Sequence, residues 1–224
     1  MTDGPVPAAT AYKAVRPDGA DFHTGTVRWA PPEGHGGEWI VRHPTAVKVG
    51  RDASEYLSVS TVATDCTGME WPCRLLTVEP VGDVAAPSQS LPHKRAGVAF
   101  RVTGEFPAHE VFGPQGEHVA ELIERARRLT PDEARTLASA RGAAWDTARD
   151  TAWGAAWDAA WGAARGAAWV ATRSTVRNAA WSTVRNAAWD AVVALVVRDL
   201  ISTDQYYVLT RSWASVIGKV HPDD

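Results

Sequence analysis

The sequence predicts an α+β protein, in which a small β-rich N-terminal domain precedes an all-helical region with a Trp/Ala repeat. Two observations predict this order. Short stretches rich in β-branched residues, separated by turns that contain glycine or proline, fill the first half of the chain. Between Pro131 and Pro222 there is no proline, and alanine, the best helix former, dominates. We therefore expect a β-rich domain at residues 8–113 and a helical region at residues 114–224.

Several short β segments are expected in the first domain. They lie at residues 11–16, 24–29, 39–42, 46–49, 56–62, 73–78, 98–102 and 111–112. Turn clusters separate them, notably at residues 16–19, 30–37, 79–83 and 86–90. This spacing of strands and turns is typical of a compact, mostly β domain.

Capping motifs set the helix boundaries in the second half. Thr130 is followed by Pro131 and, three positions after the threonine, by Glu133, so a helix is expected to begin at Pro131. Apolar residues three and four positions apart predict an amphipathic helix over residues 117–129. Ser202 and Gln205 form a second capping box, which predicts a last helix that extends toward Pro222.

Every fourth position between residues 141 and 189 is tryptophan or arginine, a pattern that we call the Trp/Arg ladder. The ladder contains most of the 11 tryptophans of the chain, against 4 Phe and 4 Tyr. Its tryptophans are Trp145, Trp153, Trp157, Trp161, Trp169, Trp181 and Trp189, and its arginines are Arg141, Arg149, Arg165, Arg173, Arg177 and Arg185. Four residues turn a helix by about 400°, so the ladder drifts by about 40° per step and no flat partner can cover it.

Three interpretations of the Trp/Arg ladder follow from this geometry. The simplest is a Trp/Ala core inside the helical region, either in one long helix that neighbours wrap or in a folded-back bundle. The second is a docking or self-assembly surface, and the third is a platform on which small molecules or bases stack. Exposed ladder tryptophans would promote aggregation, so we expect this chain or another one to cover them.

Charge and hydropathy narrow the class of protein. The formal net charge of −3 disfavours a nucleic-acid partner, because phosphate binding needs clustered cations. Residues 1–11 lack the apolar core of a secretory signal, and the apolar run at residues 191–197 is too short to span a membrane. The sequence therefore predicts a cytoplasmic protein without a membrane partner.

Common catalytic and metal-binding signatures are missing from the sequence. It contains no phosphate-binding loop, no His-Glu-x-x-His and no Cys-x-x-Cys pattern. Cys66 and Cys73 are interpreted as packed thiols, with metal or redox use as the alternative. A metal site that uses His35, His43 or Cys66 is a further alternative, but no metal or cofactor is expected.

Residues 12–19, 40–44 and 74–82 resemble an uncharacterised domain family of bacteriophage and actinobacterial mobile-element proteins. Members of this family carry repeat tails rich in Ala, Trp, Asp and Arg. The resemblance covers about residues 10–112 and implies no activity. With the Trp/Arg ladder, it favours a non-enzymatic interaction or assembly protein that forms a homo-oligomer or binds another protein.

Residues 56–61 also resemble the Ser-Thr-Ser strand of ADP-ribosyltransferases, which makes an NAD-using enzyme the alternative hypothesis. The resemblance implies that Arg16 binds the dinucleotide and that Ser58, Ser60 and Thr61 belong to the same site. Glu110, on a strand at residues 107–112, would then stabilise the developing positive charge on the sugar. Ala108 stands where that family has Glu or Gln. The other interpretation of Ser58, Ser60 and Thr61 is an ordinary half-buried strand.

Overall fold

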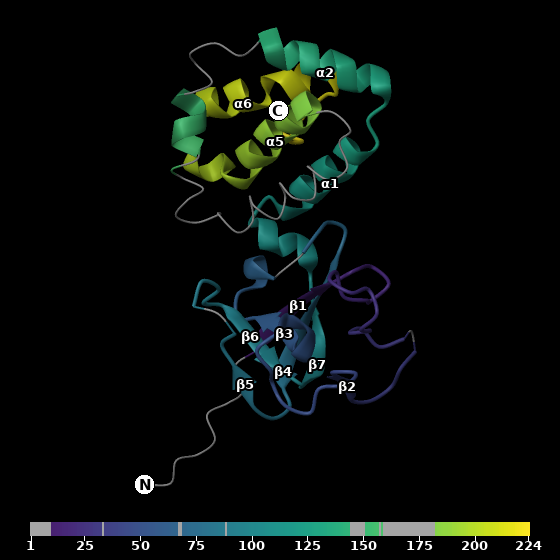
Figure 1. Cartoon of the computed structure of the whole chain (residues 1–224). Helices are drawn as coiled ribbons and strands as arrows, with labels where there is room; N and C mark the ends of the chain where they lie inside the picture. The colour runs from purple at the N-terminus through teal and green to yellow at the C-terminus, as the bar shows by residue number, and fades with distance from the viewer. Residues whose placement is uncertain are drawn as a thin grey trace. The chain divides into compact units, whose positions relative to one another are not determined.

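A computed structural model describes residues 10–32, 34–66, 69–87, 89–143, 151–156, 158 and 182–224. The chain divides into two compact units, Met1–Ala108 and His109–Asp224, which we call the sheet unit and the helical unit. Among the described residues every strand lies in the sheet unit and every α-helix in the helical unit (Figure 1), which makes this a mixed α+β protein with the β-rich part first. The domain boundary expected after residue 113 stays a prediction.

The sheet unit contains one antiparallel sheet of 7 strands, in the order β2-β7-β4-β1-β3-β6-β5. The strands are β1 (Ala11–Val15), β2 (Trp39–Arg42), β3 (Leu57–Ser60), β4 (Arg74–Pro80), β5 (Val84–Ala85), β6 (Lys94–Gly97) and β7 (Ala99–Phe106). β4 and β7 form the longest pair, and their register shifts between Thr77 and Val78. Two short 3-10 helices, η1 (Ala53–Glu55) and η2 (Ala63–Asp65), lie in the connections.

The sequence located the central strands but misplaced the edges of the sheet. The segments expected at residues 11–16, 39–42, 56–62, 73–78 and 98–102 overlap β1, β2, β3, β4 and β7. No strand forms at residues 24–29 or 46–49, where Asp21 anchors a turn and Val47 is 92% exposed. β5 and β6 were missed, because the sequence Lys-Arg-Ala-Gly of β6 has no apolar alternation and becomes a strand by pairing with β3.

Apolar side chains from several strands form the core of the sheet unit. Trp29 and Phe100 are fully buried, and their ring centroids lie 5.8 Å apart. Leu76 and Val78 extend from β4 into the same cluster, as the two-residue period of a strand requires. Burial of this cluster supplies the main stabilising free energy of the unit.

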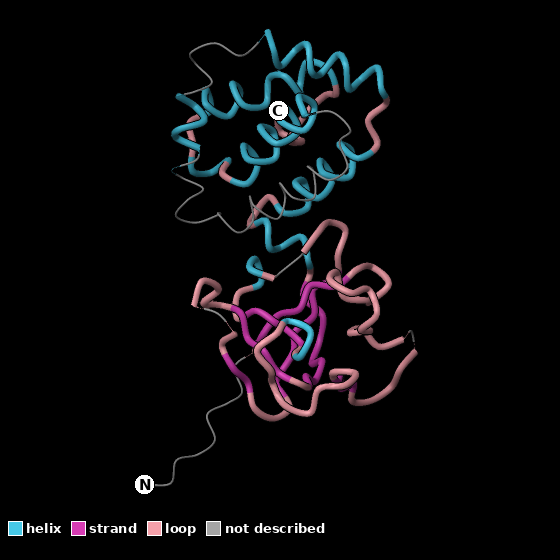
Figure 2. The backbone as a smooth tube through the Cα atoms, in the orientation of Figure 1, coloured by secondary structure: helices cyan, strands magenta, loops and turns pink. Residues whose placement is uncertain are grey.

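The helical unit contains α1 (Gly116–Arg127), α2 (Pro131–Ala143), α5 (Ser182–Val196) and α6 (Thr203–Val216), with further helical residues at 151–156. The 3-10 helices η3 (Ala108–Phe112) and η4 (Arg198–Leu200) complete its described elements. Turns and a non-helical end after α6 also belong to it (Figure 2), so the unit is rich in helix rather than all-helical.

The predicted helix starts are confirmed. α2 begins at Pro131, where the Thr130 hydroxyl accepts a hydrogen bond from the Glu133 amide at 3.2 Å. The Glu133 carboxylate accepts in return from the Thr130 amide at 2.8 Å and also pairs with Arg125. α6 begins after Ser202, whose hydroxyl accepts from the Gln205 amide. Side chains near each start therefore satisfy amide donors that helical bonding leaves free.

Helix α5 lies at the centre of the helical unit, where it contacts α1, α2 and α6. Residues 191–197, at its C-terminal end, are all buried, so this part of the helix is apolar on every side. The apolar run at residues 191–197, which the sequence showed to be too short for a membrane span, thus lies buried at the C-terminal end of α5. Within the described part of the chain, no helix is both long and apolar enough to cross a membrane.

Candidate functional site

Three members of the Trp/Arg ladder have described side chains, and they meet at Asp190. Arg141 Nε lies 3.1 Å from Asp190 Oδ2, and the indole N–H of Trp153 donates to Asp190 Oδ1 at 2.7 Å. The Trp153 and Trp189 ring centroids lie 6.1 Å apart. Arg141 and Asp190 are both buried, so these ladder residues pack inside one chain. The others lie outside the described residues, namely Trp145, Trp157, Trp161, Trp169, Trp181, Arg149, Arg165, Arg173 and Arg177, together with the side chain of Arg185.

The residues proposed for an NAD site are divided between the two units. Arg16 lies exposed just after β1, and Ser58 and Ser60 belong to β3, with Thr61 following. The carbonyl oxygen of Ser58 accepts from Lys13, and the hydroxyl of buried Ser60 accepts from the amide of residue 62 at 3.1 Å. Glu110 belongs to the helical unit and is exposed. The five residues are therefore not brought together within one unit.

The strand expected at residues 107–112 is wrong, because residues 108–112 form η3. The Gly113 amide donates to the Glu110 carbonyl at 3.0 Å, and Gly113 has a φ of 83°, so the chain turns here. Val111 and Phe112 are both buried, although neighbouring residues of a strand would point to opposite faces.

Lys13 is a half-buried cation that the sequence did not single out. It lies between Ala11 and Val15 on β1, donates to the Ser58 carbonyl at 3.2 Å and places Nζ 4.8 Å from the Trp29 ring centroid. Burial lowers the pKa of Lys13, partly offset by the nearby Cys66 and Asp21. The adjoining cavity of about 10 Å³ holds one water at most, so it is too small for a dinucleotide.

Both cysteines are free thiols, Cys66 buried and Cys73 half-buried. Burial raises the pKa of each thiol to about 12. The reactive thiolate is therefore scarce at neutral pH. Within the described ranges, which include His35, His43 and Cys66, no three His, Cys, Asp or Glu side chains are grouped to hold a metal ion.

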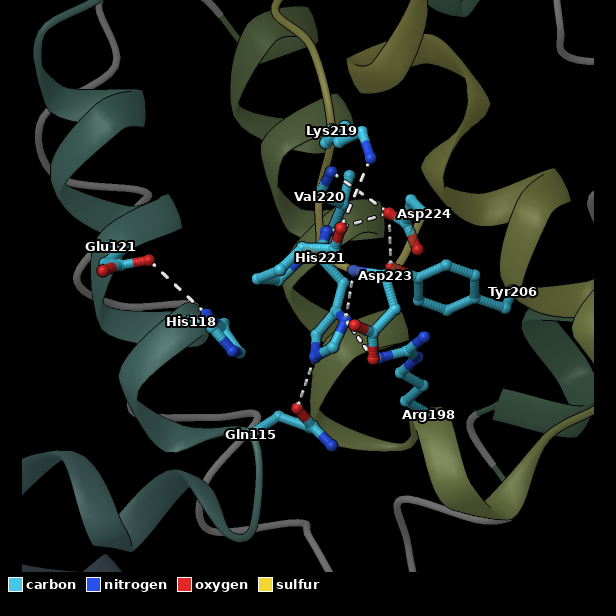
Figure 3. Close-up of polar contacts among 11 residues, drawn as sticks. Gln115, His118, Glu121, Arg198, Tyr206, Lys219, Val220, His221, Asp223 and Asp224 are labelled. Atoms are coloured by element: carbon cyan, nitrogen blue, oxygen red, sulfur yellow. Dashed lines mark hydrogen bonds and ion pairs between the residues drawn. The ribbon is translucent and has the colours of Figure 1, made fainter.

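A pair of histidines is the most distinctive polar feature of the helical unit. His118 lies in the first turn of α1, and His221 lies in the segment that follows α6. Their ring centroids are 4.6 Å apart with the planes nearly perpendicular, and Figure 3 shows both rings beside Gln115. His221 is buried, whereas the His118 side chain is 29% exposed.

Hydrogen bonds define the tautomer of His221. The backbone amide of Asp223 donates to His221 Nδ1 at 3.2 Å, so Nδ1 is an unprotonated acceptor. The proton therefore sits on Nε2, which lies 3.0 Å from the Gln115 Oε1 and donates to it. Both ring nitrogens are thus satisfied by a neutral imidazole.

The surroundings of His221 favour that neutral form. Burial lowers its pKa, and the neighbouring Arg198 and His118 lower it further, while Asp223 and Asp224 oppose the shift. Arg198 Nη1 is 3.7 Å from Asp223 Oδ2, and the Asp223 side chain is 75% exposed. Solvent therefore screens the nearest carboxylate.

An open cavity of about 450 Å³ adjoins His118 at the start of α1. It is lined by residues of the segment 109–118, including His109, Glu110 and Glu117. Gly116 allows the chain to close here, because a Cβ at this position would lie 2.1 Å from the His109 carbonyl oxygen. His118 thus contacts buried His221 and also lines this open cavity.

No family model, curated protein or solved structure matches this chain. The chemistry of the histidine pair is therefore inferred from its own contacts. Sequence reasoning did not identify Gln115, His221 or Asp223 as members of a site. The one available signal was the position of His221 directly before Pro222, toward which the last helix was expected to extend.

Proposed function

We propose that this chain is a non-enzymatic interaction or assembly protein in which the Trp/Arg ladder packs the helical unit. The contact that carries the proposal joins Arg141 and Trp153 to the two carboxylate oxygens of Asp190. One arginine and one tryptophan of the ladder thus meet a single buried acid from another helix, an arrangement that holds three segments in one relative position.

The residues beside this contact are small. Ala187, Ala188 and Ala191 are all at most 1% exposed, so helices approach α5 closely at these positions. A buried ion pair contributes little net stability, because desolvation of the two charges offsets their attraction. It does disfavour arrangements that leave either charge unpaired, so we assign the ladder the role of fixing how the helices pack.

Self-association is the second part of the proposal, because the ladder drifts by about 40° per step and so carries tryptophans round every side of a helix, which one flat neighbour cannot cover. The partner is a second copy of this chain or another protein. Origin in a phage or mobile element rests on the family resemblance and stays a prediction.

Light scattering over a range of protein concentrations tests the assembly. We expect a molar mass above that of one chain that rises with concentration, and a smaller mass for the ladder variant Trp169→Ala. The matched control Tyr207→Ala removes an exposed aromatic ring outside the ladder and should leave the mass unchanged. A single-chain mass at every concentration would overturn self-assembly and leave the ladder as internal core alone.

The NAD-using alternative stays a prediction of the second resemblance. Incubation with NAD would release nicotinamide if it holds, and Glu110→Gln would abolish that release. Lack of both release and binding removes this alternative.

A further inference from the structure

The segment at residues 219–224 folds back on the helical unit after α6. Gly218, with a φ of 119°, allows the chain to turn. Asp224 Oδ2 then accepts from the Tyr206 hydroxyl at 3.0 Å and from the His221 and Val220 amides at 2.8 and 3.2 Å (Figure 3). These bonds hold the segment as a compact turn that covers Tyr206, which is 4% exposed.

His221 connects this turn to α1. Its Nε2–H donates to Gln115, the N-cap residue of α1, and its ring packs against His118 one turn later. The two contacts use a neutral ring, since the Asp223 amide donates to Nδ1. A proton on Nδ1 would oppose the Asp223 amide and break that bond, leaving as acceptor the solvent-exposed Asp223 carboxylate, whose Oδ2 lies 3.4 Å from Nδ1.

We propose that His221, packed against His118, forms a pH-operated latch. The neutral His221 ring holds residues 219–224 against α1, and its protonation releases this segment and uncovers Tyr206 and the start of the helix. The His118 ring, at a centroid distance of 4.6 Å, is part of the surface from which the charged His221 ring would be released.

Charged groups from each neighbouring element affect the latch. Arg198 of η4 lowers the pKa of His221 through its positive charge. Its Cζ atom also lies 5.4 Å from the centroid of the Tyr206 ring of α6. From α1, Glu121 Oε2 lies 3.5 Å from His118 Nδ1 but is 77% exposed. Within the segment, Lys219 bonds the carbonyl of Pro222, and Asp223 and Asp224 favour the charged ring. Asp223 Oδ2 lies 3.4 Å from His221 Nδ1 and favours the charged ring, as Asp224 does, but burial and the nearby Arg198 outweigh them, so the pKa of His221 stays below its ordinary value.

The direction of the pH dependence follows from the neutral ring of the docked state. Once the segment is released, the pKa of His221 returns toward its ordinary value of 6.5, whereas docking holds the pKa lower. Between these two pKa values, the released form therefore binds more protons than the docked form. Docking is complete above pH 6.5 and is lost as pH falls through the lowered pKa.

Amide hydrogen exchange of the intact chain, measured between pH 8 and pH 5 and normalised to intrinsic rates, tests the latch. The amides of Val220, His221 and Asp223 are hydrogen-bonded in the docked turn. We expect their protection to fall by about tenfold per pH unit once His221 begins to protonate, as uptake of one proton requires. Protection that stays constant down to pH 5 would overturn the proposal.

Two variants separate the latch from general acid sensitivity. His221→Asn keeps an acceptor near Nδ1 but cannot titrate, so its exchange should not depend on pH. His109→Asn removes another histidine of the same unit and should keep the dependence of the unaltered protein. If His221→Asn does not fold, an NMR titration of His221 in the unaltered chain replaces it. A His221 midpoint at or above 6.5, or pH-dependent exchange in His221→Asn, would overturn the latch.

Discussion

The cores of the two units both bury apolar side chains, but they differ in what else they enclose. In the sheet unit, Trp29, Phe100 and Leu76 form an apolar cluster drawn from distant parts of the sequence. In the helical unit, Ala-rich helices enclose the ion pair of Arg141 with Asp190. Both units thus depend on buried apolar area, and the helical unit depends in addition on correct pairing of two buried charges.

This difference predicts different responses to substitution. An apolar core loses stability in proportion to the volume removed, because each lost methylene leaves part of a cavity. A core with a buried ion pair loses much when one partner is removed and little when both are replaced by apolar residues.

Asp190→Ala should have the largest effect, because it removes the carboxylate that both Arg141 and Trp153 contact. Loss of one partner from a buried pair costs about 3–5 kcal/mol of unfolding free energy. Urea unfolding followed by circular dichroism would measure this loss in the helical signal.

The double variant Arg141→Met/Asp190→Leu is the informative comparison, since it removes both charges and should recover most of the lost stability. Asp204→Ala removes an exposed acid in the first turn of α6 and should change the unfolding free energy by less than about 0.5 kcal/mol. A double variant as unstable as Asp190→Ala would show that volume and not charge pairing governs this core.

Leu76→Ala applies the same test to the sheet unit. Leu76 is 1% exposed in the apolar cluster, so its truncation should lower the unfolding free energy by about 2–5 kcal/mol. Trp29 lies in this cluster, and the NMR signal of its indole N–H would report the change during urea unfolding. Val84→Ala, at an exposed position of β5, is the matched control and should have little effect. Equal losses for the two variants would contradict the importance of burial here.

The predictability of the fold differs between the units in the same way. Helix starts at Pro131 and after Ser202 could be predicted, because the capping residues lie within three positions of the amides they bond. Strand β6 could not, since its pairing partner β3 lies more than thirty residues earlier in the chain. Hydrogen bonds between residues close in sequence can thus be predicted from the sequence, whereas the pairing of distant segments becomes visible only in the three-dimensional structure.

The candidate site was less predictable than the fold. The periodicity of the Trp/Arg ladder was visible in the sequence, but its acidic partner Asp190 was not singled out. The contact between His118 and His221 joins residues a hundred positions apart, and the chain reaches it only by turning at Gly218. Neither pairing leaves a local spacing signal.

Ser202→Ala should produce a smaller loss than the core substitutions. The Ser202 hydroxyl accepts from the Gln205 amide at 3.2 Å, and Gln205 Oε1 accepts from the Ser202 amide at 2.9 Å. Loss of such a cap costs about 1 kcal/mol. Thermal unfolding would detect the difference, and the neighbouring Thr203→Ala, which removes a hydroxyl outside the cap, should not reproduce it. Equal effects of the two variants would argue against capping.

The smallest expected effect concerns Glu133, which extends the comparison to pH. Hydrogen bonds from the Thr130 amide, Arg125 and the Thr130 hydroxyl lower the pKa of this carboxyl to about 2. A lowered carboxyl pKa stabilises the native state above the ordinary value of 4.5, and the contribution is lost as pH falls toward 2.

An NMR titration of the Glu133 side chain should therefore show a midpoint near 2. Thr130→Val should raise that midpoint because it removes the hydroxyl donor, whereas Arg135→Gln, which breaks the neighbouring pair with Asp132, should leave it unchanged. A midpoint near 4.5 in the unaltered protein would contradict the cap. Because the bonds span three positions of the chain, apart from the one to Arg125, acid should loosen the start of α2 without disturbing the apolar cluster of the sheet unit.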